Sequence, residues 1–463
     1  MIPSNRIFAF RRVAAAITVF ALVGASALRA QQAAPASLGQ RLRLSLGDAA
    51  RLAARQSNAV QGAEQRAAEA LARVTQSRAA LLPDLSANLV QSGRTFNSVT
   101  FGITLPSAPG QPPLFNPAGE VLGPVNTLDL RGRVQANLLD FSAYARVRTA
   151  QVAVSAARAD VANAGDLAAT QAANAYVRVL RGNAQLQARL ADSTLARELL
   201  SIAQSQLEAG VGVALDVTRA QSELAGIRAQ LISARNERDR AQLDLRRTLN
   251  LALDAPLELT DSLSSVVPEN LALDQQTATA RALHDRSDLR AADEQLRAAR
   301  QTVSAIRTER LPSVSAFGDD GIIGGNANRM LPTYTYGIQL SLPIFDGFRR
   351  EGRIQEQQAV TRELDVRRRD LEQQASVDVR GALLDLAAAR EAVGASRDRL
   401  RFAEQEVSQA AERFRAGVAG NADVVNAAFT LNAARSQYID VLTSLQMARV
   451  SLARSEGAVT QLR

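Results

Sequence analysis

The sequence predicts a mainly α-helical protein made of two tandem repeats, each of which combines two β-strands with long helices that pack side by side. Three observations support this fold class. The stretches 125–255 and 344–463 contain no proline and place apolar residues three and four positions apart, as amphipathic helices do. A glycine turn of similar sequence interrupts each stretch. Two short segments alternate apolar and polar residues, as half-buried strands do.

The composition favours close-packed helices over a large globular core. The chain has 463 residues, of which 46% are hydrophobic but only 4% are aromatic, and none is tryptophan. Much of the apolar content is alanine, the best helix former, whose small side chain lets neighbouring helices approach closely. The net charge of +8 comes from arginine alone, because the chain has no lysine. Acids and arginines are interspersed as on solvated helix faces, and the basic stripe of a nucleic-acid-binding protein is missing.

No catalytic, cofactor-binding or metal-ligating constellation is found, so we do not expect an enzyme. The absence of cysteine excludes disulfides, thiolate metal sites and cysteine nucleophiles. The single histidine, His284, lies on a predicted helix and is interpreted as a surface residue. The stretch 318–328 (GDDGIIGGNAN) faintly resembles a calcium-binding repeat, but one copy without a period is interpreted as an exposed loop.

The amino terminus predicts export from the cytoplasm. Residues 1–12 are basic, 13–25 are apolar but too short to span a bilayer, and small residues follow. This is the pattern of a signal peptide over 1–30, with cleavage expected after Ala27 or Ala30. Beyond it, no stretch is apolar enough for a transmembrane helix, which leaves an exported soluble protein or one that spans a membrane with strands.

The internal repeat sets the expected domain boundaries. Ala-Gly-Val at 209–211 recurs at 416–418, and each copy is followed at the same distance by Asp-Val, at 216–217 and at 423–424. Leu-Pro at 82–83 and 311–312 gives a second pair of landmarks, and LLDF at 138–141 and IFDG at 344–347 a third. The predicted segments are a first repeat over 44–251, a linker over 252–270 and a second repeat over 271–457.

Each repeat is expected to begin with one helix of about 30 residues that ends at its Leu-Pro. The predicted strands are about 84–100 and 126–140 in the first repeat and 312–320 and 333–345 in the second. A helix pair then turns at 209–216 or at 416–423. The first helix of each pair would have about 65 residues and be roughly 100 Å long, at about 1.5 Å per residue.

The two most regular strands each have one apolar face, which we expect to contact lipid. In the first repeat these residues are Leu128, Leu130, Val134 and Leu138, and in the second they are Tyr336, Ile338, Leu340 and Leu342. The opposite face of the first strand carries Arg131 and Arg133, which would face a lumen. Four strands cannot close a membrane barrel, and open edges in lipid cost several kcal/mol per unpaired group, on the order of 2–7. Two copies would give eight strands, and three copies would give twelve, the smallest multiple expected to leave a channel.

In the order and spacing of these motifs, the whole mature chain resembles the TolC-like outer-membrane efflux proteins. The resemblance implies a homotrimer whose twelve-stranded transmembrane β-barrel continues into a coiled-coil-like helical tunnel in the periplasm. It implies the outer membrane of a Gram-negative bacterium as location, and as partners a periplasmic adaptor protein and an inner-membrane pump of RND or ABC type. The implied function is the passive exit duct of a tripartite pump for drugs or other small molecules, or alternatively the duct of a type I protein secretion system.

The resemblance also assigns roles to the glycine turns. Adaptor contacts are implied for Gly210, Val211, Gly212, Gly417, Val418 and Gly420, and a periplasmic aperture for Asp216, Asp423 and Asn426. Phe414 and Ala419 stand where the family has a tyrosine and an arginine that link helices, so those linking contacts are not expected here. A plainer interpretation stays open for part of this set, because glycine after a helix and aspartate in a first turn are ordinary helix-end residues.

A protein of another class, a periplasmic coiled-coil adaptor or scaffold, would share the long alanine-rich helices and the glycine turns. It would not need strands that face lipid, and the alternating strands therefore argue against it.

Overall fold

The computed structural model describes residues 42–101, 119–264 and 274–462, which are mainly helical, and those from Arg43 onward form one compact unit. The expected signal peptide over 1–30, the segment 102–118, part of the linker and the start of the second repeat lie outside the described residues. The elements as far as the linker are β1 (Leu42–Leu44), α2 (Leu46–Gln56), α3 (Asn58–Ala79), β2 (Asp84–Asn97), the 3-10 turn η2 (Ser98–Phe101), β3 (Val121–Asp140), α4 (Phe141–Glu208) and α5 (Ala214–Thr248). From the linker onward they are β4 (Leu257–Leu259), α6 (Gln275–Asp285), α7 (Ser287–Thr308), β5 (Ser313–Gly324), β6 (Met330–Ser341), α8 (Arg349–Arg415), α9 (Asn421–Ser455) and η3 (Val459–Gln461).

The first helical segment of each repeat is broken in two, where we had expected one helix. In the first repeat Ser57 adopts an extended backbone conformation between α2 and α3. Its side chain accepts a hydrogen bond from the backbone N–H of Val60, so Ser57 is the N-cap of α3. In the second repeat Arg286 separates α6 from α7 in the same way. The expectation of one helix was wrong because the apolar spacing continues across a residue whose backbone is not helical.

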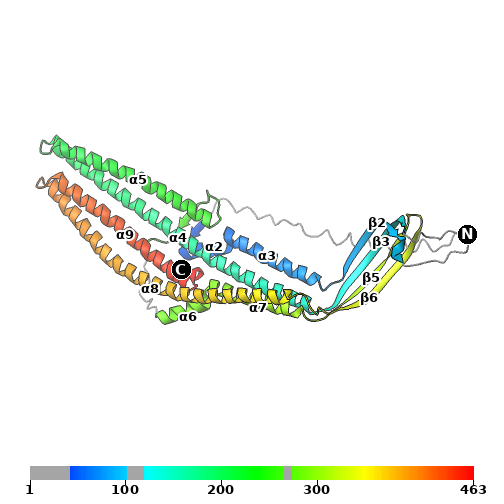
Figure 1. Ribbon diagram of the computed structural model, residues 1–463. Coiled ribbons are helices and arrows are strands. Elements are labelled where there is room, and N and C mark those ends of the chain that lie inside the picture. The colour runs from blue at the N-terminus through cyan, green and yellow to red at the C-terminus, as the bar shows by residue number, and fades with distance from the viewer. Residues whose placement is uncertain (1–41, 102–118, 265–273, 463) are drawn as a thin grey trace, which may run out of the picture. The chain divides into compact units, whose positions relative to one another are not determined.

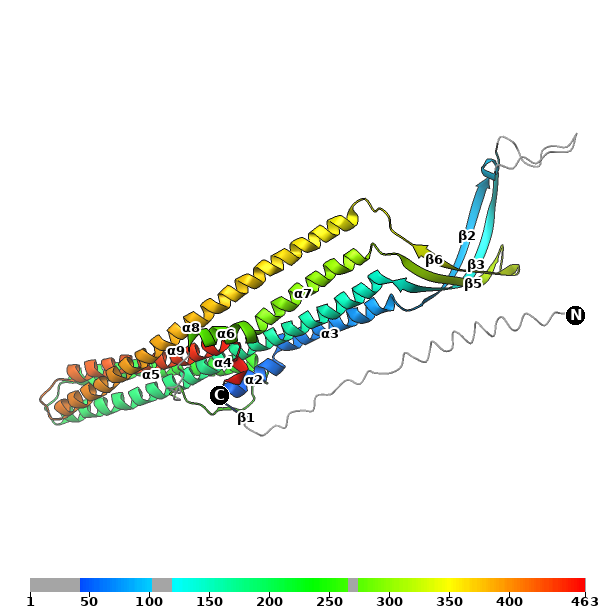
Figure 2. The ribbon, with the colours of Figure 1, turned by 90° about the horizontal axis from the view of Figure 1, so that it is seen from below.

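Two long helical hairpins, α4–α5 and α8–α9, contain the longest elements of the described residues (Figures 1 and 2). Besides α5, helix α4 packs against α2, α3, α7 and α9, so it connects both repeats. Its buried face is rich in alanine, with Tyr176, Val177 and Val179 at the centre of the core. At Gly182 a Cβ atom would stand 3.0 Å from the Cα of Arg238, which shows how closely α4 and α5 approach. Small residues permit this spacing, as the composition predicted.

The four longer strands form one antiparallel sheet in the order β2-β3-β5-β6. Each repeat contributes one hairpin, and the two hairpins meet where β3 pairs with β5. β2 and β6 are the edge strands. The register shifts twice by one residue, and the extra residue is on β3 each time: opposite Arg94–Phe96 of β2, and between Asn137 and Leu139.

Several strand boundaries differ from those expected: β2 ends earlier, at Asn97, while β3 and β6 begin earlier, at Val121 and Met330. The loop predicted over 318–328 begins with strand, because β5 runs to Gly324 and places Asp319 and Asp320 in the ladder. Glycine and aspartate are poor strand formers, but β5 is a central strand whose backbone pairs on both sides, and this pairing outweighs the propensity. β6 ends at Ser341, short of the predicted 345, since Pro343 has no N–H to donate to a ladder.

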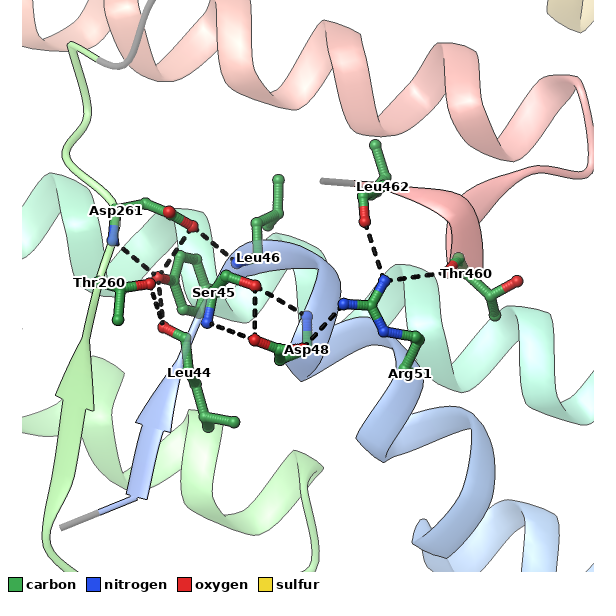
Figure 3. A network of polar contacts seen from close by, with 10 residues as sticks. Leu44, Ser45, Leu46, Asp48, Arg51, Thr260, Asp261, Thr460 and Leu462 are labelled. Carbon is green, nitrogen blue, oxygen red and sulfur yellow. Dashed lines mark hydrogen bonds and ion pairs between the residues drawn. The ribbon is translucent and has the colours of Figure 1, made fainter.

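The start of the first repeat, the linker and the carboxyl-terminal end are tied together by polar contacts (Figure 3). The Asp261 carboxylate accepts hydrogen bonds from the backbone N–H of Leu46 at 2.7 Å and from the Tyr176 hydroxyl at 3.1 Å. Burial raises the pKa of the Tyr176 hydroxyl. Arg51 donates to the backbone carbonyl of Leu462 at 3.1 Å, which anchors the end of the chain to α2. β1 and β4 pair beside this network.

Among the described residues, no helix combines the length and hydropathy that crossing a membrane requires.

Candidate functional site

The two glycine turns have the same backbone geometry. Gly210 and Gly417 follow α4 and α8 with φ of +72° and +71°, the left-handed conformation that glycine adopts without strain. The next residue closes each turn, since the N–H of Val211 donates to the Gln206 carbonyl and that of Val418 donates to the Arg413 carbonyl, both at 3.0 Å. The repeated Ala-Gly-Val is therefore a repeated helix end.

The turns lie side by side at one end of the hairpins (Figures 1 and 2). The Asn421 side chain donates a hydrogen bond to the backbone carbonyl of Asp216 at 2.8 Å, and the Gln206 side chain donates to the carbonyl of Phe414 at 2.7 Å. Arg415 forms an ion pair with Glu198 across the two hairpins. The sequence analysis did not predict these contacts, because no short motif indicates them.

Phe414 contributes to the packing between the two hairpins. Its ring is buried in an apolar cluster between the two hairpins, with Leu199, Ala203, Ala411 and Val424. A phenylalanine lacks the hydroxyl group of tyrosine, and here the side chain contributes apolar burial instead. The cluster and the three polar contacts above hold α4–α5 against α8–α9 near the turns.

The residues expected at the aperture lie on two different helices. Asp423 and Asn426 are exposed and lie three positions apart, so they share one face of α9. Asp216 lies in the first turn of α5 and is partly exposed, with Arg219 3.9 Å away. The structure links Asp216 to α9 through its backbone carbonyl and not through its carboxylate.

The apolar side chains at the turns are exposed. Val211 is 79% exposed and Val418 is 68% exposed. Gly212 packs closely, because a Cβ atom there would stand 2.9 Å from the backbone of Gln206, whereas Gly420 has open space around it. The paired turns therefore present exposed valines, among them Val213 at 58%, on a compact backbone.

Farther from the turns, Arg189 connects three helices in a set of contacts that we call the Arg189 cluster. The Arg189 guanidinium, on α4, donates hydrogen bonds to four side chains on α4, α5 and α9: Asp192, Gln230, Asn432 and Ser436. Asp192 also accepts from Arg435 of α9 at 2.6 Å, and its side chain is only 5% exposed. Burial, together with the nearby charge of Asp192, raises the pKa of Glu223 on α5. Sequence reasoning missed this cluster, since its members become neighbours only once α4 and α9 are known to pack together.

The sheet has an apolar and a polar face. Cα partners in the register place Val134 of β3 beside Leu85 and Gly318, and Gly318 in turn beside Tyr336. We call this the apolar face. On β6 the side chains of this face, among them Tyr336, Ile338 and Leu340, are exposed, and so is Leu342 just beyond the strand. On β3, Leu130, Val134 and Leu138 are exposed, whereas Leu128 is half-buried.

On the polar face the expected basic lining is offset by acids. Arg131 donates to Asp319 at 2.8 Å and forms an ion pair with Asp129 at 2.9 Å, so its charge is compensated within the chain. Arg133 is exposed, and its Cα partner is the same Asp319. The part of the polar face around Arg131 and Arg133 thus carries two arginines and two aspartates.

The arrangement of paired hairpins, repeated glycine turns and a shared sheet defines a class of outer-membrane channel protein. The family model described as "Outer membrane efflux protein" matches residues 49–251 and 278–458. The chain therefore belongs to the outer membrane efflux protein family. This result confirms the family, the two tandem repeats and the location in the outer membrane, and a family of channels confirms that the chain is not an enzyme. It also sets aside the adaptor alternative.

Similar proteins include the alkaline protease secretion protein AprF of Pseudomonas aeruginosa, which is 27% identical over 280 residues, 58% of this chain and 54% of AprF. The toluene efflux pump outer membrane protein TtgF of Pseudomonas putida is 31% identical over 182 residues, 37% of this chain and 36% of TtgF. The chain thus matches about half the length of these relatives or less. The crystal structure of the Campylobacter jejuni CmeC outer membrane channel is 18% identical with a TM-score of 0.72, covers 89% of this chain and 85% of its own, and shows the same fold.

Proposed function

We propose that three copies of this chain form one outer-membrane channel that serves as the passive exit duct of a tripartite efflux pump. The observation that carries the proposal is the four-stranded sheet, in which β2 and β6 each leave one edge unpaired among the described residues and whose apolar face is exposed. Open edges in lipid are unfavourable, so the sheet must close with other copies. Successive strands alternate in direction, and β6 of one copy can therefore pair antiparallel with β2 of the next, which gives a twelve-stranded barrel for three copies.

Cysteine cross-linking tests the closure, because the native chain has no cysteine. Asn88 on β2 and Gln339 on β6 both lie on the polar face, by their register with Arg131 and Ser315. We expect the double variant Asn88→Cys/Gln339→Cys, treated with a short bifunctional maleimide in outer-membrane fractions, to give a covalent trimer. Each single variant is the control and should give only monomers on gels after complete denaturation that also dissociates the non-covalent trimer. Monomers from the double variant, or cross-linking by one cysteine alone, would contradict the proposed closure.

We place the aperture of the channel at Asp423 and Asn426, with Asp216 beside them. Three copies of an exposed carboxylate around one axis would bind cations and make conductance sensitive to divalent ions. In planar bilayers, Asp423→Ala should lose much of the sensitivity to divalent cations added on the side of the turns. Asp398→Ala, which removes an exposed carboxylate farther along α8, is the matched control. Equal sensitivity of both variants would remove Asp423 from the aperture.

The paired turns are proposed as the docking surface for a periplasmic adaptor, with an inner-membrane pump beyond it. Gly210, Gly212, Gly417 and Gly420 would allow close backbone approach, and the exposed Val211 and Val418 supply apolar contact area. Val211→Glu/Val418→Glu should abolish efflux-dependent resistance while the trimer still assembles. Loss of the trimer would instead show that the valines serve assembly.

Secretion of a polypeptide is the second candidate function. It is favoured by the similarity to AprF, whose name refers to secretion of a protease, whereas TtgF is named for toluene efflux. A deletion strain complemented with this chain separates the two, since recovery of resistance to small toxic compounds supports efflux and recovery of a secreted protein supports the alternative.

A further inference from the structure

One row of side chains on the polar face of the sheet is mainly apolar. In the register, Asp129 of β3 lies between Val90 of β2 and Ile323 of β5. Ile323 in turn lies beside Leu331 of β6. The row belongs to the polar face, because Asp129 stands two positions from Arg131 on the same strand. We call Val90, Ile323 and Leu331 the Leu331 row.

The Leu331 row is accessible to solvent within the chain. Val90 is 52% exposed, Leu331 is 72% exposed and Ile323 is half-buried. None of the apolar clusters found among the described residues includes a member of the row. The row does not belong to the face expected to contact lipid either, because the adjacent positions Leu130 and Ile322 lie on that opposite face. Neither a core nor the lipid therefore accounts for these three side chains.

Polar side chains lie on both sides of the row along the strands. On one side, the next row of this face holds Asn88, Arg131 and Thr333. On the other side, the hydroxyl groups of Ser92 and Thr127 are hydrogen-bonded at 2.8 Å. The Leu331 row is therefore a narrow apolar strip between polar surfaces.

Strand propensity alone does not explain the choice of residues. Thr333 and Thr335 follow Leu331 on the same face of β6, and threonine combines a high strand propensity with a hydroxyl group. A polar side chain is thus compatible with this face of the strand. Leucine at position 331 adds exposed apolar area that the strand does not need, which indicates that this area contacts another molecule.

The charge nearest the row is compensated within the chain. Arg131 donates from Nε to the Asp129 carboxylate at 3.1 Å and also donates to Asp319 at 2.8 Å. The Asp129 side chain is only 26% exposed. A molecule that reaches the row therefore meets apolar area beside a paired carboxylate. Its apolar part, and not the sign of its charge, then determines the strength of the contact.

We propose that the Leu331 row is a contact site inside the duct for the apolar part of small molecules that leave the cell. Side chains stand roughly perpendicular to a sheet, so closure with other copies keeps the row on the inside and repeats it around the axis. The cargo that the row favours is a small molecule with an apolar body. The inference rests on the proposed function, because it requires the polar face to line the lumen, and it adds the chemical class of the cargo and the place of contact.

Block of the channel current by two quaternary ammonium ions tests the contact. Trimers in planar bilayers receive tetrabutylammonium or tetramethylammonium, which have the same charge and differ in apolar area. Tetrabutylammonium should block the native channel at the lower concentration. The triple variant Val90→Thr/Ile323→Thr/Leu331→Thr removes apolar area and keeps residues that suit a strand. It should weaken block by tetrabutylammonium about tenfold, the effect of losing contact with about two methylene groups, and leave block by tetramethylammonium unchanged.

Three variants serve as controls. Leu89→Thr/Ile322→Thr makes the same kind of change in β2 and β5 but on the opposite face, and this channel should be blocked as the native one is. Thr333→Val adds apolar area beside the row, so it should strengthen block by tetrabutylammonium. Asp423→Ala should keep the difference between the two ions, because a carboxylate distinguishes ions by charge and not by apolar area.

The outcomes separate this inference from the proposed function. Equal block of the native channel by the two ions, or native-like block of the triple variant, would overturn the contact site and leave the duct in place. If the triple variant forms no channels, Thr333→Val decides, and unchanged block of that variant by tetrabutylammonium overturns the inference. A native chain that forms no channel at all would overturn the proposed function instead.

Discussion

Removing the carboxylate at the centre of the Arg189 cluster should destabilise the helical part of the protein strongly. Asp192 is nearly inaccessible to solvent and receives Arg189 at 3.0 Å and Arg435 at 2.6 Å. In Asp192→Ala both arginine side chains, which are 13% and 23% exposed, would stay largely buried without their carboxylate. Breaking a buried pair from one side costs about 3–5 kcal/mol. We expect about 3 kcal/mol, the lower end, because Arg189 keeps Gln230, Asn432 and Ser436 as acceptors.

Urea unfolding of the purified protein in detergent, followed by circular dichroism at helical wavelengths, measures this loss as a shift of the midpoint at constant slope. Asp398→Ala is the matched control, because Asp398 pairs with Arg401 at 3.0 Å on an exposed part of α8. Exposed pairs of this kind contribute about 0.3–0.5 kcal/mol. If Asp192→Ala and Asp398→Ala unfold at the same urea concentration, the cluster does not stabilise the packing of α4 on α9.

Three further outcomes follow from single residues. Gly417→Ala should destabilise the second turn by about 1–2 kcal/mol, because residue 417 has a left-handed backbone conformation. Gly381→Ala, inside α8 with open space around it, should be neutral or stabilising, and thermal unfolding compares the stability of the two variants. Leu340→Arg should block assembly at a cost of roughly 2–4 kcal/mol per chain near the midplane, while Gln339→Arg on the polar face should still give heat-stable trimers on gels. The raised pKa of Glu223 means that the folded state binds the proton more tightly than the unfolded state, so the stability that the protonated carboxyl contributes is lost as pH rises through the folded pKa. Glu223→Gln should lose this part of the pH dependence of the unfolding free energy between pH 4 and pH 7. An unchanged pH profile in unfolding titrations would contradict the assignment to Glu223.

The repeated elements were predictable because both copies carry the same physical signal. Gly210 and Gly417 stand where a helix must end in a left-handed residue, and few other residues adopt that conformation. The strands around Leu130 and Leu340 were visible because each has one apolar and one polar face. The periodicity of apolar residues and the residues that end a helix are local properties, and a sequence shows them directly.

Elements fixed by distant partners were harder to see. The second half of β5 contains Asp319, Asp320 and three glycines and was interpreted as a loop, yet it is held on both sides by β3 and β6. The compensation of Arg131 by Asp319 depends on the same pairing, since these residues lie far apart in the sequence. The break at Ser57 did carry a local signal, an N-cap residue within a helical pattern, and could have been predicted.

The contacts between the two turns arise where the repeats differ, and this makes the duplicated chain asymmetric. Asn421 starts α9 and donates to the first turn, whereas its counterpart Ala214 at the start of α5 has no such group. Phe414 fills the cluster between the hairpins, and its counterpart is the smaller Leu207, which stays exposed. Duplication alone would give two equivalent hairpins without a reason to dock in one order. Gln206 of the first hairpin donates in the opposite direction, to the Phe414 carbonyl, and its counterpart in the second hairpin is Arg413. These differences between the repeats contribute to how the second hairpin packs on the first.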